Sequence, residues 1–118
     1  MNKEFVSNQQ ALELQQLGFD EPCLMYYDYS SKLIESEVYK CKAPLYQQAF
    51  RWFREKYDLD SYIMPARLET KKVYDYYIWF SNKEGERDLF IGMNNEYTYE
   101  EAENECLNKL ITTLKQKK

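Results

Sequence analysis

Few side chains in this chain could carry out acid–base or metal chemistry, because its 118 residues include no histidine. The commonest general base near neutral pH and the commonest metal ligand are therefore both missing. Asp75 is the first candidate to consider, since a carboxylate between Tyr74 and Tyr76 could have a raised pKa and act as a general base. The sequence offers it no second catalytic group. We therefore favour a structural place for Asp75, near a strand end or beside a lysine or arginine.

The cysteines and the paired acids also lack the neighbours that catalysis needs. Cys23, Cys41 and Cys106 are odd in number and widely spaced, which argues against a disulfide framework or a zinc site. Without histidine as a base, none of them is a convincing nucleophile. Glu100 and Glu101 are adjacent, so a helix places them on different sides, and helix capping explains them better than a two-carboxylate site. We therefore expect no catalytic residues, no metal and no cofactor.

Aromatic residues are the most unusual feature of the composition, with twelve tyrosines, six phenylalanines and two tryptophans. Tyrosine combines a rigid apolar ring with a polar hydroxyl and is favoured at interfaces. This suggests a binding surface for a peptide, a base or a partner chain. Its candidate residues are Tyr26, Tyr27, Tyr29, Trp52, Tyr77 and Trp79. The alternative is that these aromatic side chains pack inside a strand-rich core, and we favour this interpretation of the aromatic residues.

Trp52 enters this set through a second pattern. Arg51, Arg54 and Lys56 are close to it in the sequence and could form a small basic and aromatic patch on which single-stranded nucleic acid stacks. Glu55 interrupts the patch, so a solvated helix face is the favoured interpretation. Trp52 itself should lie beside the apolar stripe of its helix, half covered.

The overall composition predicts a single soluble domain over residues 1–118, because 44% of the residues are hydrophobic and 31% are charged. No run is long enough to span a membrane, and the first residues lack the apolar core of a signal peptide, so we expect a cytoplasmic protein. The formal net charge of −4 makes the protein acidic and opposes a general affinity for nucleic acid or an anionic membrane.

The strand expected at 73–80 should organise the fold. Tyr76 and Ile78 point to one face of this strand, while Tyr77 and Trp79 point to the other. Both faces are largely apolar and aromatic. The pattern therefore predicts a central strand in a sheet that is covered on both sides.

The remaining strands are predicted from short aromatic and β-branched runs between turn residues. They are expected at 23–29, 61–64 and 89–91. Pro65 should end the second of these strands. Residues 33–41 fit either a helix or an edge strand, and we favour the edge strand.

Helices are expected at 7–17, 44–57 and 98–115. Ser7 is a suitable N-cap for the first, and Gly18 can take the left-handed conformation that ends it. Pro44 is well placed at the first position of the second helix. Thr98 and Glu101 have the spacing of a capping box, which should start the third.

Together these elements predict an α+β fold. The sheet is expected to be antiparallel, with four to five strands and two helices on one face. The helices at 44–57 and 98–115 should share that face, and the shorter N-terminal helix should lie over the other.

Two segments resemble small uncharacterised proteins that are common in bacterial phages and prophages. They are the proline-opened helix APLYQQAFRWFREKY at 43–57 and the helix start TYEEA at 98–102. In those proteins a helix of this kind precedes short strands, and some of them are grouped as α/β/α sandwiches. The resemblance implies a sandwich-type fold and a phage or prophage origin. It brings no known activity and no site residue to this chain.

The order helix, three strands, helix over residues 44–116 is similar to that of the double-stranded-RNA-binding domain. In that family, lysines at the start of the last helix contact phosphates. The matching turn here holds Glu100, Glu101 and Glu103, whose charges would repel phosphates. Lys71 and Lys72 in the preceding loop are too few to reverse this.

The leading functional hypothesis is a non-catalytic accessory protein of phage or prophage type that binds a protein partner through an aromatic surface. It rests on the lack of catalytic residue types together with the surplus of tyrosine. The alternative is a nucleic-acid-binding module with the RNA-binding-domain order of elements. A homodimer that buries tyrosine and tryptophan is a further expectation about partners.

Overall fold

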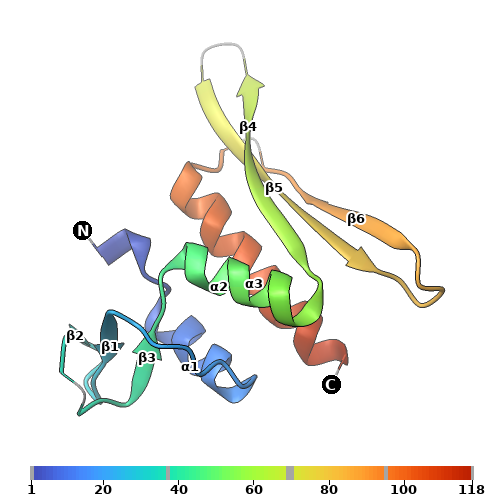
Figure 1. Ribbon diagram of the computed structural model, residues 1–118. Helices are drawn as coiled ribbons and strands as arrows, with labels where there is room; N and C mark the ends of the chain where they lie inside the picture. Colours follow the sequence, from blue (N-terminus) through green and yellow to red (C-terminus); the bar gives the residue numbers. More distant parts are fainter. Residues whose placement is uncertain (1, 37, 69–70, 95, 118) are drawn as a thin grey trace.

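The computed structural model describes residues 2–36, 38–68, 71–94 and 96–117 and shows an α+β protein (Figure 1). Within these residues the chain forms three α-helices and two three-stranded antiparallel sheets. In chain order the elements are the 3-10 helix η1 (Asn2–Glu4), α1 (Asn8–Gln16), β1 (Met25–Tyr27), β2 (Leu33–Ile34), β3 (Cys41–Ala43), α2 (Tyr46–Tyr57), β4 (Asp60–Leu68), β5 (Lys71–Ser81), β6 (Arg87–Gly92) and α3 (Tyr99–Lys117).

The small sheet is formed by the N-terminal part of the chain and has the order β2-β1-β3. Tyr27 pairs with Cys41, and Met25 pairs with Ala43, so these four side chains lie on one face. Tyr27, Cys41 and Ala43 are buried on that face. The helix α1 packs on β3 and therefore supplies part of their cover.

The large sheet has the order β4-β5-β6, with β5 in the centre. Tyr62 pairs with Tyr77, and Tyr77 pairs with Ile91, which sets the register across all three strands. Helix α3 packs on β5 and α2 packs on β4, and the two helices also contact each other. They cover one face of this sheet, and no helix in Figure 1 lies over the other.

The main core lies between the large sheet and the helices α2 and α3. Apolar side chains recur at three- and four-residue intervals on both helices, which gives each a buried face. On α2 and α3 these residues are Tyr46, Ala49, Phe50, Trp52, Phe53, Ala102, Cys106, Leu107, Leu110, Ile111 and Leu114. Tyr76 and Ile78 of β5 are buried in the same cluster.

Gly92 allows the Tyr76 ring to lie across the edge strand β6. The two residues are paired between β5 and β6. A Cβ built at Gly92 would collide with the ring of Tyr76. Glycine in a strand often marks such a close approach.

The ends of α1 follow the local signals of the sequence. Ser7 and Gln10 form a capping box, in which the Gln10 amide donates to the Ser7 hydroxyl and the Ser7 amide donates to the Gln10 side chain. Gly18 follows the helix with a φ of 105°, in the left-handed region that glycine tolerates. Thr98 and Glu101 form the same kind of box at the start of α3.

A buried amide network joins the N-terminal helix to α2 and α3. The side chain of Gln10, only 2% exposed, donates through Nε2 to Asn104 Oδ1 and to Asn108 Oδ1, both at 2.9 Å. The Tyr46 hydroxyl donates to Gln10 Oε1 at 3.1 Å. Because these polar groups satisfy one another, a glutamine is accommodated inside the core.

The prediction of one sheet with four to five strands is not confirmed, since the strands divide into two sheets of three. The helix α1 does not lie over the second face of the large sheet, because it packs on β3 and on α3 instead. The strand β5 is central as expected, but it is covered by helices on one face only.

Several local predictions are also corrected. The strand β4 continues through Pro65 to Leu68, because an edge strand leaves some of its N–H groups unpaired and so tolerates proline. Helix α2 begins at Tyr46 with Leu45 as its N-cap, so Pro44 precedes the cap instead of occupying the first helical position. The segment 33–41 is not helical where it is described; it contributes β2 and the first residue of β3, and Glu37 lies outside the described residues.

None of the helices in the described parts of the chain is both long enough and apolar enough to cross a membrane.

Candidate functional site

The face of the large sheet that points away from α2 and α3 carries a row of aromatic and apolar side chains. We call it the open face and define it by Tyr62, Met64, Tyr77, Trp79 and Ile91, which share one side of the sheet by strand alternation and register. Tyr62 is 41% exposed, and Met64 and Ile91 are each 44% exposed. Tyr77 and Trp79 are half-buried.

The rings of the open face hold one another in position. Tyr62 and Tyr77 stack with their centroids 5.3 Å apart and their planes 14° from parallel. Trp79 Nε1 donates a hydrogen bond to the Tyr62 hydroxyl at 3.2 Å. Rings fixed in this way lose little conformational freedom when another molecule covers them.

Charged groups lie within the open face and at one end of it. Asp75 is opposite Met64 and points to the same side as Tyr77. Its carboxylate has no hydrogen bond or ion pair with any other residue that the structure describes. At the end of the face Arg87 forms ion pairs with Asp58 and Asp60, both at 2.8 Å. Asp75 therefore adds a negative charge that no described cation neutralises.

The structure separates the aromatic residues that the sequence suggested for binding. Tyr77 and Trp79 lie together on the open face. Tyr26 lies on the small sheet, where its ring stacks on Tyr39 at a centroid distance of 4.3 Å. Tyr29 is 81% exposed in the turn after β1. The predicted surface is thus divided between the two sheets.

Two of the suggested residues are buried and cannot form an exposed surface. Tyr27 donates from its hydroxyl to the backbone carbonyl of Val6 at 2.6 Å. Trp52 is only 3% exposed rather than half covered, because its ring packs edge-on against Phe19 and Tyr57 at 5.5 and 5.3 Å. Arg51, Arg54 and Lys56 are exposed, and Arg51 forms an ion pair with Glu21 at 3.7 Å, so these basic side chains do not form a patch with the buried indole.

Sequence reasoning did not identify Tyr62, Met64 and Ile91 as members of a surface. Alternation within the strand at 61–64 could have placed Tyr62 and Met64 on one face. Their position beside Tyr77 and Asp75 depends on the register of the β4–β5 hairpin. That register is not readable from one strand alone.

The thiols are poor nucleophiles in this structure. Burial raises the pKa of the Cys106 thiol to about 12 and that of Cys23 to about 11. Burial also raises the pKa of Cys41. A thiol with a raised pKa supplies little thiolate near neutral pH, and the thiolate is the reactive form.

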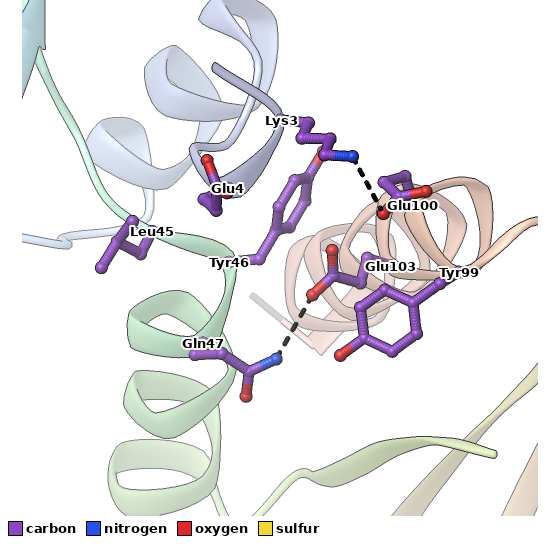
Figure 2. A pocket seen from close by; sticks show the side chains of 8 residues that line it. All are labelled: Lys3, Glu4, Leu45, Tyr46, Gln47, Tyr99, Glu100 and Glu103. Atoms are coloured by element: carbon purple, nitrogen blue, oxygen red, sulfur yellow. Dashed lines mark hydrogen bonds and ion pairs between the residues drawn. The ribbon is translucent and has the colours of Figure 1, made fainter. Parts of the chain in front are cut away.

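A pocket lies between η1, the start of α2 and the start of α3 (Figure 2). Its volume is about 360 Å³. Glu103 is part of its lining although it is only 6% exposed, and its Oε2 accepts a hydrogen bond from Gln47 Nε2 at 3.3 Å. Burial is the main cause of the raised pKa of Glu103, and the nearby Glu100 raises it further.

The described residues include no group of three or more histidine, cysteine, aspartate or glutamate side chains that could hold a metal ion. No protein-family model matches the chain, no curated protein is found to be similar, and no solved structure matches its fold.

Proposed function

We propose that this chain is a non-catalytic accessory protein, of the phage or prophage type suggested by its sequence, that binds a protein partner through the open face. The observation that carries the proposal is the in-register cluster of Tyr62, Tyr77 and Trp79 on a sheet face without a helix over it. Tyrosine, tryptophan and methionine are enriched at the centres of protein interfaces.

The partner is expected to present a lysine or arginine flanked by apolar side chains. Asp75 offers an unpaired carboxylate beside Tyr77 and Met64, so a basic group could form an ion pair there while its neighbours cover the rings. A second copy of this chain is a poorer match, because it would bring another Asp75 and a net charge of −4 to the same interface.

A site-specific cross-linking experiment tests the proposal. A photoreactive benzoylphenylalanine replaces Tyr77 in one variant and Tyr29 in a control variant, since Tyr29 lies in the exposed turn after β1, outside the open face. In host lysate we expect one discrete cross-linked protein at position 77 and no such product at position 29. With that protein purified, Trp79→Ala should weaken binding by about thirtyfold or more, the effect of removing a central aromatic anchor.

Several results would contradict this function. Equal capture at both positions, or unchanged affinity of the Trp79→Ala variant, would show that the open face is not the binding surface. A product made only of two copies of this chain would replace the proposed partner by a homodimer.

A nucleic-acid-binding function is the second candidate, because the order α2, β4, β5, β6, α3 matches the order of elements expected for an RNA-binding domain. The exposed acids Glu100 and Glu101 at the start of α3 oppose phosphate binding. Titration with duplex RNA and with single-stranded DNA at low salt separates the two functions. Salt-sensitive binding at about micromolar affinity or tighter would favour this second candidate.

A further inference from the structure

The pocket beside η1 has the composition of a site for an organic cation. Its charged residues are three glutamates, Glu4, Glu100 and Glu103, and one lysine, Lys3. The rings of Tyr46 and Tyr99 form its apolar walls, and Figure 2 shows Glu103 between them. At about 360 Å³ the pocket is near the lower end of the ~300–1,000 Å³ that ligand sites occupy. A small molecule or a single long side chain would fill it.

Glu103 is the feature that a cationic ligand would explain. Glu103 is more than nine-tenths buried as a residue, yet no lysine or arginine in the described chain forms an ion pair with it. The one nearby cation, Lys3, is directed to Glu100 at 3.9 Å instead (Figure 2). Gln47 donates a hydrogen bond to Glu103 but brings no charge. Buried carboxylates are normally paired, so this one lacks a counter-ion.

We propose that this pocket binds a primary ammonium or guanidinium group, with the Glu103 carboxylate as its ion-pair partner and the rings of Tyr46 and Tyr99 around its alkyl chain. Tyrosine faces attract cations and also pack on methylene groups. Glu100 and Glu4 add negative charge at the mouth of the pocket. The group can belong to a free alkylamine or to a lysine or arginine side chain of another protein.

Amide-resolved NMR titrations of the full chain test this site. The probes are n-butylammonium, N-acetyl-lysine amide and N-acetyl-arginine amide, with n-butanol as a neutral control of similar size. We expect saturable shifts at Gln47, Tyr99 and Glu103 with the cations, and at least about tenfold weaker binding of n-butanol. Tighter binding of n-butylammonium than of the amino-acid amides would identify a free amine as the source, and the reverse order would identify a protein side chain.

Matched variants distinguish binding in the pocket from a nonspecific attraction of cations to an acidic chain. Glu103→Gln should weaken binding of n-butylammonium by about thirtyfold or more, because it removes the buried charge and keeps a polar side chain. Glu105→Gln removes the same charge from the same helix outside the pocket and should leave the affinity within about twofold. Lys3→Ala removes the competing cation and should strengthen binding by about two- to fivefold.

If Glu103→Gln disturbs folding, the Lys3→Ala variant still tests the site, because unchanged or weaker binding of n-butylammonium by that variant would contradict it. Equal losses in the Glu103→Gln and Glu105→Gln variants would overturn the site, as would shifts spread over all acidic residues or equal affinity for n-butanol. Because the open face is not part of this pocket, these results do not depend on the proposed protein partner.

Discussion

The two sheets have the same number of strands and the same antiparallel pairing, but they use their aromatic residues differently. In the small sheet Tyr27 is buried, and its hydroxyl is satisfied by the carbonyl of Val6 inside the fold. In the large sheet the indole N–H of Trp79 is satisfied by Tyr62 on the open face. In both sheets an aromatic side chain has a partner for its polar group. Only the Trp79–Tyr62 pair of the large sheet is accessible to another molecule. Aromatic content alone therefore does not distinguish a core from a binding surface.

Ile78→Ala should produce the largest effect, because Ile78 faces the helices while its neighbour Tyr77 faces the open side. We expect a loss of about 2–5 kcal/mol in the free energy of unfolding, from lost burial and the cavity left behind. Urea denaturation followed by circular dichroism measures it. Tyr77→Ala is the paired control and should cost clearly less. Equal losses would mean that the open face is as well packed as the core.

High pH should destabilise the fold through buried groups of the large sheet and its helix. Burial raises the pKa of Tyr76 and of Cys106 to about 12, from 10.0 and 9.0. Their contribution to stability is complete below the unfolded values and is lost as the pH rises towards about 12, because the unfolded chain releases these protons first. Urea midpoints measured between about pH 8 and 11 should therefore decrease.

The Tyr76→Phe variant tests the origin of that pH dependence. It should reduce the slope of stability against pH, because it removes one of the groups whose pKa is raised by burial. Urea midpoints over the same pH range measure the slope. A slope equal to that of the unaltered chain would contradict a role for the buried Tyr76 hydroxyl.

Tyr27→Phe tests the buried hydroxyl of the small sheet. The carbonyl of Val6 would lose a 2.6 Å hydrogen bond within the core, and a buried acceptor without a partner costs about 1–3 kcal/mol. Thermal and urea unfolding measure the loss. Tyr26→Phe is the control on the outer face of the same sheet, and it should change stability by less than about 0.5 kcal/mol.

Arg87→Ala should have the smallest effect on stability, although Arg87 makes two ion pairs at the end of the open face. All three partners are partly exposed, and exposed ion pairs contribute about 0–1 kcal/mol. Urea unfolding in low and in high salt provides the measurement. A loss of several kcal/mol would show that the hairpin end depends on these charges.

Local signals in the sequence predicted the helices well. Ser7 with Gln10, and Thr98 with Glu101, are short-range patterns whose hydrogen bonds form within four residues. The apolar spacing on the last helix likewise depends only on helical geometry, and Cys106 is buried where that spacing placed it. Such features need no knowledge of the rest of the chain.

The division into two sheets and the open face could not be predicted in the same way. Nothing in the short segment at Met25–Tyr27 shows that it pairs with β3 instead of joining the large sheet. The strand containing Tyr77 is aromatic on both faces, so its pattern does not reveal which face the helices cover. Trp52 was expected at the border of the core. It is buried because Phe19, which lies before α2, and Phe53 and Tyr57 of α2 itself pack against its ring.

The amide network around Gln10 has a consequence for the order in which the protein forms. Gln10 and Asn104 are 94 positions apart, so α1 cannot be locked in place until α3 has been synthesised. Bringing such distant residues together costs loop-closure entropy and is expected late in folding. On the ribosome α1 can pack on β3 before α3 emerges, but the side of α1 that carries Gln10 stays uncovered until then. Such transiently exposed surface is what chaperones protect.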